Sequence, residues 1–268
     1  MDALNGKRLV ILGMARQGTA LARFAVNAGA AVTLSDMRPA GKLTAAIDSL
    51  ADLPVDRLRY VLGDHPFSLL DECDILALSG GISTELPLVV EAQARDIPLT
   101  NDSLEFMHRT PAPVIGITGS AGKTTTTALV GQMGQKSTRR TWIGGNIGRP
   151  LVADLPDISA ADLVVMELSS FQLELWHDCS PQVAAILNIT PNHLDRHKTM
   201  MRYADAKSNI LRHQKAGDIA VLAADDDGSR EMQATVRGRL RQFSARQPIN
   251  DGAFVRDGYI WLANDGNQ

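Results

Sequence analysis

Several features that would narrow the class of this protein are scarce or absent in its sequence. The 268 residues include only two cysteines, Cys73 and Cys179, and these form no CxxC pair. Nothing therefore requires an oxidising compartment, and we expect two buried, reduced thiols. No apolar run approaches the length of a membrane span, and residues 1–7 are polar where a signal peptide would lie. These absences predict a cytoplasmic protein without a membrane partner.

An excess of basic residues is also lacking. The chain has 27 Lys and Arg against 30 Asp and Glu, which gives a net charge of −3. Duplex-binding surfaces depend on many unpaired basic groups, so we expect no nucleic-acid partner. Anionic ligands must instead be bound locally, by loops and helix ends.

Short apolar runs alternate with helical patterns along the first part of the chain. Strands are expected at 7–12, 31–34, 74–78 and 97–100, and helices at 19–28 and 87–95. This alternation is typical of a parallel sheet covered by helices. Pro111 and Pro113 then favour an extended connector. We therefore predict two α/β domains, at 1–110 and 111–268.

The second domain is predicted to begin with a strand at 114–117. Further strands are expected at 163–166, 183–187 and 219–222, and residues 252–262 are expected to form a hairpin that turns at Asp257 and Gly258. The predicted fold class is thus α/β, with a Rossmann-like parallel sheet followed by a P-loop ATPase-type domain.

A glycine-rich loop follows the strand at 114–117 and opens a helix. Its residues are Gly119, Ser120, Ala121, Gly122, Lys123, Thr124 and Thr125. Glycines let backbone N–H groups face phosphate oxygens, and the helix N-terminus adds its positive dipole end. The lysine can reach the β- and γ-phosphates, and the first threonine hydroxyl can ligate Mg²⁺. The usual P-loop has a glycine where this chain has Ile117, so the match is to Gly-Lys-Thr after a glycine-rich turn.

The turn after the first strand permits three interpretations. Gly13 and Gly18 resemble a dinucleotide fingerprint, but Ala15 occupies the position of the second glycine, where even a methyl group hinders close approach of a pyrophosphate. A tight turn without a ligand is the second interpretation. We favour the third, a nucleotide-type ligand bound differently, with Asp36 and Arg38 as candidates to hold its base or ribose.

Polar residues also follow the predicted strands of the second domain. Glu167 is either a helix cap or a Mg²⁺ ligand beside the phosphate loop. His193, taken alone, is typical of a hydrogen-bonded structural histidine, and Lys207 of a solvated lysine. Residues 144–148, Gly-Gly-Asn-Ile-Gly, form a polar glycine loop with no evident structural need for its glycines.

These segments together resemble the Mur ligases, the ATP-dependent enzymes that form amide bonds in peptidoglycan precursor assembly. The resemblance depends on residues 119–124, 144–148, 167–174 and 188–197. Residues 167–174, Glu-Leu-Ser-Ser-Phe-Gln-Leu-Glu, are most similar to the D-glutamate-adding members. The resemblance extends over all 268 residues in domain order.

The resemblance implies ligands and roles. The ligands are ATP, two Mg²⁺ ions that Mn²⁺ can replace, UDP-N-acetylmuramoyl-L-alanine and D-glutamate, bound by a monomer. The catalytic residues would be Lys123, His193 and Lys207. Thr124 and Glu167 would ligate one Mg²⁺, and Glu167, His193 and a carbamylated Lys207 the other. Asn146, Ser169 and His193 would lie along the substrate. Its UDP group would contact Ala15, Arg16, Asp36, Met37, Arg38, Ser79, Gly80 and Gly81.

The sequence departs from the family in several places. The family commonly has Asn where this chain has Ala121, Asp where it has Asn192, and Pro where it has Gly80. Family members also carry a third, C-terminal domain, so we expect this chain to be a fragment whose ATPase domain is truncated and which does not ligate alone. The alternatives are a Mur-type ligase for another amino acid, an NAD-dependent oxidoreductase and an ATP-binding regulatory module.

Overall fold

A computed structural model describes residues 1–264. The chain divides into two compact units, one of residues 1–106 with 149–157 and the other of residues 107–148 with the chain from 158 onward. The predicted domain boundary at 110 lies close to this division. Residues 149–157, which were predicted to lie in the second domain, belong to the first unit. Each unit is described by itself.

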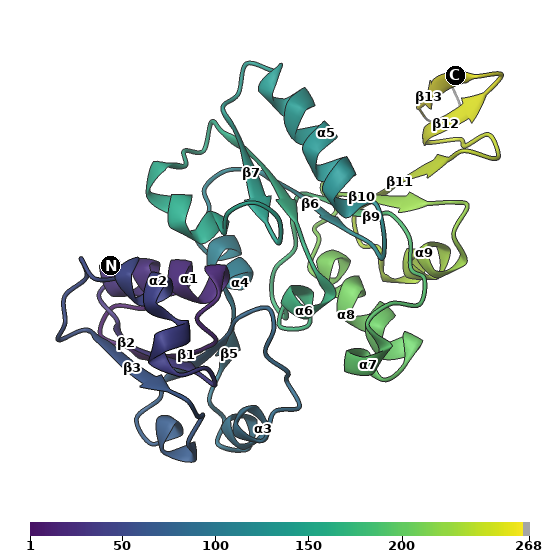
Figure 1. Ribbon diagram of the computed structural model, residues 1–268. Coiled ribbons are helices and arrows are strands. Elements are labelled where there is room, and N and C mark those ends of the chain that lie inside the picture. Colours follow the sequence, from purple (N-terminus) through teal and green to yellow (C-terminus); the bar gives the residue numbers. More distant parts are fainter. Residues whose placement is uncertain (265–268) are drawn as a thin grey trace. The chain divides into compact units, whose positions relative to one another are not determined.

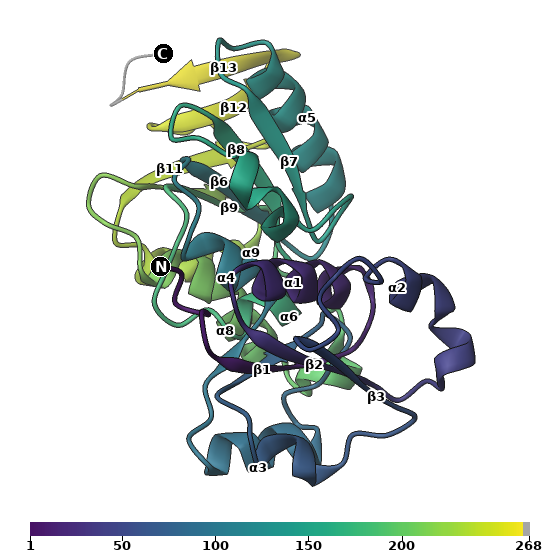
Figure 2. The same cartoon turned by 90° about the vertical axis from the view of Figure 1, so that its left-hand side faces the viewer.

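The first unit is a five-stranded parallel sheet with helices on both faces. Its strands run in the order β3-β2-β1-β4-β5. Figure 2 shows α1 and α2 on one face of this sheet and α3 on the other. The elements are β1 (Arg8–Leu12), α1 (Arg16–Asn27), β2 (Ala31–Asp36), η1 (Ala40–Lys42), α2 (Thr44–Asp48), β3 (Leu58–Leu62), η2 (Phe67–Leu70), β4 (Ile75–Leu78), α3 (Pro87–Ala94), β5 (Leu99–Thr100), α4 (Asp102–Met107) and η3 (Leu151–Asp157).

The burial of β1 explains its central place. Leu9, Val10, Ile11 and Leu12 are all at most 4% exposed, so both faces of the strand are covered. A continuous apolar run of this kind suits a parallel strand between two helix layers. Each such side chain contributes about 1.5–3 kcal/mol by leaving water.

The second unit contains an eight-stranded sheet in the order β13-β12-β11-β10-β9-β6-β8-β7. All neighbours are parallel except β12 and β13, which form an antiparallel hairpin. Figure 1 shows α5 on one face and α6, α8 and α9 on the other. The elements are β6 (Val114–Thr118), α5 (Lys123–Gln135), β7 (Thr141–Gly145), β8 (Leu163–Glu167), α6 (Ser170–Leu173), β9 (Val183–Ile186), α7 (Leu194–His197), α8 (Met200–Arg212), β10 (Ile219–Ala223), α9 (Asp227–Glu231), η4 (Met232–Thr235), β11 (Arg239–Ser244), β12 (Gly252–Arg256) and β13 (Tyr259–Ala263).

Both sheets place their first strand in the interior, with later strands on either side. In the first unit β1 lies between β2 and β4, and in the second β6 lies between β9 and β8. Open α/β sheets bind ligands at the carboxyl ends of the strands beside such a reversal of strand order. The loops after β1, β4, β6 and β8 are therefore where ligands are expected.

The predicted α/β class is confirmed, as are the predicted strands and the hairpin at Asp257 and Gly258. Strands β3, β7 and β11 were not predicted. The loop predicted at 144–148 is wrong in part, because Gly144 and Gly145 end β7. Of the two cysteines, Cys73 is buried and Cys179 is only partly buried. Among residues 1–264, no helix has the length and apolarity needed to cross a membrane.

Candidate nucleotide and metal site

The loop between β6 and α5 has the conformation of a phosphate-binding turn. Gly122 caps α5 with φ 81°, a left-handed conformation that side chains with a β-carbon adopt only with strain. This turn brings the loop to the N-terminus of a 13-residue helix. The helix end offers unsatisfied N–H groups and a positive dipole end, which together attract phosphate.

Lys123, the first residue of α5, folds back over this loop. Its Nζ donates hydrogen bonds to the carbonyl oxygens of Gly119, at 2.9 Å, and Ser120, at 3.3 Å. Both partners are neutral, so the ammonium charge has no carboxylate bound to it there. It is thus available to a phosphate that enters the loop.

The loop is held in place by residues that the sequence analysis did not single out. Asn188, just after β9, accepts a hydrogen bond from the Ala121 N–H at 2.9 Å and donates one to the Ala121 carbonyl at 3.1 Å. Ser120 contacts the Thr190 carbonyl and the Tyr203 hydroxyl, each at 2.9 Å. Asn188 and Thr190 lie in the segment 188–197, whereas Tyr203 belongs to no segment that resembles the family.

Glu167 is the last residue of β8 and is 1% exposed. Its carboxylate accepts hydrogen bonds from the Thr124 hydroxyl at 2.9 Å and the Asn146 amide at 2.8 Å. Both hydrogen-bond donors are neutral, and a buried carboxylate is costly unless a cation, such as the nearby Lys207 ammonium or a metal ion, offsets its charge. The three side chains offer the hydroxyl, carboxylate and amide oxygens that Mg²⁺ prefers.

The alternative role for Glu167, a helix cap, is wrong. The N-cap of α6 is Ser169, whose hydroxyl accepts a hydrogen bond from the Gln172 N–H, while the Gln172 side chain bonds back to the Ser169 N–H. This capping box also gives Ser169 a structural role that the sequence analysis did not foresee.

Lys207 is not a solvated lysine. It lies on α8, is 1% exposed, and donates a hydrogen bond from Nζ to the Thr118 hydroxyl at 3.1 Å. The pKa of Lys207 is lowered from 10.5 to about 7, first by burial and then by the positive charge of Lys123, while the negative charge of Glu167 partly opposes both. Near neutral pH a substantial fraction of this amine is therefore uncharged.

His193 stands apart from these groups. It is exposed, caps α7 with φ 51°, and its ring lies against Phe171 with centroids 5.0 Å apart. Among the described residues it makes no hydrogen bond to Glu167 or Lys207. The buried histidine of the segment is His197, which contacts the Ser170 hydroxyl at 2.9 Å.

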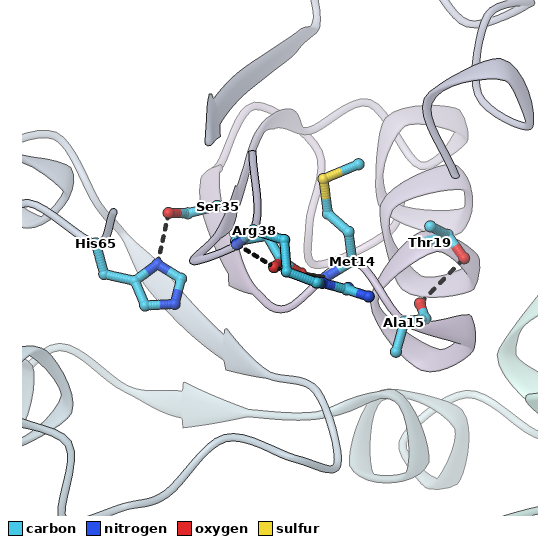
Figure 3. Close-up of polar contacts among 7 residues, drawn as sticks. Met14, Ala15, Thr19, Ser35, Arg38 and His65 are labelled. Atoms are coloured by element: carbon cyan, nitrogen blue, oxygen red, sulfur yellow. Dashed lines mark hydrogen bonds and ion pairs between the residues drawn. The ribbon is translucent and has the colours of Figure 1, made fainter. Parts of the chain in front are cut away.

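A second group of candidate residues lies at the carboxyl edge of the first unit's sheet (Figure 3). Asp36 ends β2 and is 6% exposed. Its two oxygens accept hydrogen bonds from the Met14 N–H at 2.8 Å, the Arg38 N–H at 2.9 Å, and the Arg38 guanidinium at 2.8 and 2.9 Å. These bonds hold the pKa of Asp36 far below its usual range, with the Arg38 side chain as the largest cause.

Because Asp36 is engaged within the chain, its neighbours are the groups left to meet a ligand. The Arg38 side chain is 52% exposed and Met37 is 59% exposed. Ala15 caps α1 in an extended conformation, and Arg16 begins that helix. The same turn requires glycine at position 18, because a β-carbon there would lie 1.9 Å from the Gly13 carbonyl oxygen.

The loop after β4 contains Ser79, Gly80 and Gly81. The Ser79 N–H donates to the Leu12 carbonyl at 3.0 Å, which ties this loop to the end of β1. Its hydroxyl is buried and has no hydrogen-bond partner within residues 1–264. A buried hydroxyl without a partner is costly, and a ligand atom would satisfy it.

Family models match both units of the chain. Residues 117–256 match the model described as the Mur ligase middle domain, and residues 7–101 match the Mur ligase MurD-like, N-terminal domain. The chain belongs to the Mur ligase family. The first match contains the phosphate loop, Glu167 and Lys207, and the second contains Asp36, Arg38 and Ser79.

Curated relatives agree with this Mur ligase assignment. The UDP-N-acetylmuramoylalanine--D-glutamate ligase of Pelotomaculum thermopropionicum is 37% identical over 262 residues, which cover 98% of this chain and 57% of the relative. The ligase of the same name from Geotalea uraniireducens is 39% identical over 269 residues, which cover 100% of this chain and 58% of the relative. The chain thus spans somewhat over half the length of the relatives that it matches.

Solved Mur ligase structures confirm the fold. The structure of UDP-N-acetylmuramate:L-alanyl-gamma-D-glutamyl-meso-diaminopimelate ligase from Neisseria meningitides matches with a TM-score of 0.61 and 16% identity, over 98% of this chain and 85% of that one. A murein peptide ligase from Psychrobacter arcticus matches with a TM-score of 0.52 and 16% identity, over 90% of this chain and 54% of that one. At these identities the likeness concerns the fold alone.

Proposed function

We propose that this chain forms the nucleotide-binding part of a ligase that uses ATP to join D-glutamate to UDP-N-acetylmuramoyl-L-alanine. The observation that carries the proposal is the contact of Glu167 with Thr124 and Asn146 beside a phosphate loop, because it joins three of the four segments that resemble the family. The names of the relatives support the choice of amino acid. We further propose that the protein acts in the cytoplasm as a monomer.

Thr124 and Glu167 would hold Mg²⁺ at the loop. Their oxygen donors fit this ion better than they fit a softer metal. When bound, Mg²⁺ or Mn²⁺ neutralises the charge of the ATP phosphates and orients them. Thr124 is then a ligand through its hydroxyl, and the Asn146–Glu167 hydrogen bond sets the direction of the carboxylate.

The chain's own contribution to the reaction is positioning and charge neutralisation. The Lys123 ammonium and the N-terminus of α5 hold the β- and γ-phosphates. The alanyl carboxylate of the UDP-linked substrate attacks the γ-phosphorus, the bond from that phosphorus to the bridging oxygen of ADP breaks, and an acyl phosphate forms. The amine of D-glutamate then adds to the acyl carbon, phosphate leaves, and the amine proton passes to solvent.

Lys207 is proposed to act as a carbamate. The uncharged amine adds to CO₂ and loses one proton, which replaces a buried cation by an anionic oxygen donor. The lowered pKa of Lys207 supports this step, because only the neutral amine is a nucleophile. Glu167, His193 and the carbamate would hold the second Mg²⁺, and the exposed His193 ring would turn inward to do so.

In the first unit, Arg38 and Met37 are proposed to meet the UDP group, with Asp36 orienting Arg38. The Ser79 hydroxyl and the backbone at Gly80 and Gly81 would receive the phosphates, near Ala15 and Arg16. In the second unit, Asn146, Ser169 and His193 would lie along the rest of the substrate.

Calorimetry on this chain separates the proposal from its rivals. UDP-N-acetylmuramoyl-L-alanine should bind, Mg-ATP should bind weakly, and NAD should not bind. The Arg38→Ala variant should weaken the first of these interactions only. Binding of NAD with no response to the UDP-linked substrate would favour an oxidoreductase and overturn the proposal.

A further inference from the structure

Two segments of the second unit meet at the amino edge of its sheet. One, residues 107–113, leads into β6, and the other, residues 174–182, leads into β9. The two strands are parallel neighbours, so the segments that precede them lie side by side. The Val114 N–H donates to the Gln182 side chain at 2.8 Å and fixes this approach. The phosphate loop follows the opposite, carboxyl end of β6.

These segments bring together donors of three kinds. His108 Nε2 lies 2.9 Å from the Asp178 carboxylate. Ligand atoms of His108, Asp178 and Cys179 all lie within 4.8 Å of one another, and no other group of three or more His, Cys, Asp or Glu in residues 1–264 meets this condition. Neither the phosphate loop nor the proposed mechanism uses these residues.

His177 adds a fourth donor with a preset orientation. Its Nδ1 lies 2.9 Å from the Leu175 carbonyl, an acceptor, so Nδ1 carries the proton. Its Nε2 is therefore unprotonated and can accept a metal ion, and it lies 3.9 Å from the Asp178 carboxylate. Histidines that bind metal ions commonly donate their other N–H to a backbone carbonyl in this way.

We propose that His108, Asp178 and Cys179 form a zinc site, with His177 or water in the fourth position. Imidazole nitrogen, thiolate sulfur and a single carboxylate suit Zn²⁺ or another late transition metal, whereas Mg²⁺ takes oxygen ligands. In a tetrahedral site with Zn–N of about 2.0 Å and Zn–S of about 2.3 Å, ligand atoms lie about 3.3–3.6 Å apart. A side-chain adjustment of about 1 Å from the observed spacing would close the site.

The Cys179 thiol is protonated in the metal-free chain. Burial, followed by the negative charge of Asp178, raises its pKa to about 12. Zinc would take the thiolate and release one proton to solvent. The ion would then link the segment before β6 to the segment before β9, which is a structural role at the edge of the sheet away from ATP.

The test is titration of the tag-free, metal-free chain with Zn²⁺ by calorimetry, and with Co²⁺ by absorption spectroscopy. We expect one zinc per chain and a thiolate-to-cobalt charge-transfer band. Cys179→Ser should abolish the band, and His108→Ala should raise the Kd for zinc at least about tenfold. Cys73→Ser is the matched control, because it removes the other thiol, which lies in the first unit, and it should leave both signals unchanged.

Asp178→Asn keeps the shape of the side chain but removes its charge, and it should also weaken zinc binding. Circular dichroism shows whether each variant folds. The proposal is wrong if the chain binds no zinc, or if folded Cys179→Ser and His108→Ala bind zinc like the parent chain. A charge-transfer band that Cys73→Ser removes instead would place the metal elsewhere. Because these measurements do not involve ATP, they test the zinc site independently of the proposed ligase activity.

Discussion

The burial of Lys207 predicts that removing its amine stabilises the chain while it destroys the proposed activity. The pKa of this lysine falls from 10.5 to about 7 on folding, chiefly because the amine is buried. Between these two values the unfolded chain binds more protons than the folded chain, so the free energy of unfolding rises with pH across this window. Below about pH 7 the amine is protonated in both states, and the free-energy cost of burying the charged amine is at its full value.

The size of this cost follows from the same pKa values. At about 1.4 kcal/mol per pH unit, the interval from 10.5 to about 7 corresponds to about 5 kcal/mol. Replacing Lys207 by Met removes this cost but also the hydrogen bond to Thr118 and the charge beside Glu167. These two losses offset part of the about 5 kcal/mol, and we expect Lys207→Met to stabilise the chain by about 1–4 kcal/mol near pH 7.

Urea unfolding in CO₂-free buffers measures the effect. The advantage of Lys207→Met over the parent chain should be largest at and below about pH 7 and should fall by more than half by about pH 9.5. Lys136→Met, at an exposed position at the end of α5, is the matched control for losing a surface lysine. If the free energies of unfolding of Lys207→Met and the parent changed in parallel between these pH values, Lys207 would not have a lowered pKa in the folded chain.

Further predictions concern the two proposed ligand sites. Lys123→Ala should weaken Mg-ATP binding at least about tenfold in equilibrium dialysis, since it removes the cation over the loop; unchanged affinity would exclude the phosphate-loop assignment. Glu167→Gln should raise the Mg²⁺ concentration needed for ATP binding, and titrations that superimpose on those of the parent would exclude a metal ligand. Asp36→Asn, which frees Arg38, should weaken binding of the UDP-linked substrate several-fold in calorimetry, and a shift in ATP affinity alone would contradict this.

Local sequence patterns were enough to predict the parallel sheets and the phosphate loop. Apolar runs such as 9–12 are buried on both faces, and the glycines before Lys123 leave few other conformations for the turn. The strands that were not predicted have weaker apolar patterns in the sequence. β3 and β11 contain arginines and no fully buried run, so their place in a sheet depends on neighbouring strands that a sequence window does not contain.

The candidate site was only partly predictable for a similar reason. That Glu167 meets Thr124 follows from adjacent parallel strands ending at one edge, which topology supplies. The burial of Lys207 depends on how α8 packs, and its residue type alone suggested a solvated side chain. Thr118, which contacts Lys207, carries no sequence signal beyond its place at the end of a strand, and Asn188, which supports the loop, is marked only by its place in the segment 188–197.

The proposed reaction is the ATP-dependent joining of D-glutamate to the UDP-linked alanyl substrate. The most direct measurement uses the proposed ligase of which this chain would form the nucleotide-binding part, with substrate labelled with ¹⁸O in the alanyl carboxylate, ATP and D-glutamate. We expect one amide product per ADP and one ¹⁸O transferred to inorganic phosphate, with neither formed by Lys123→Ala. Ligation of a different amino acid, or amide formation without ¹⁸O in the phosphate, would contradict it.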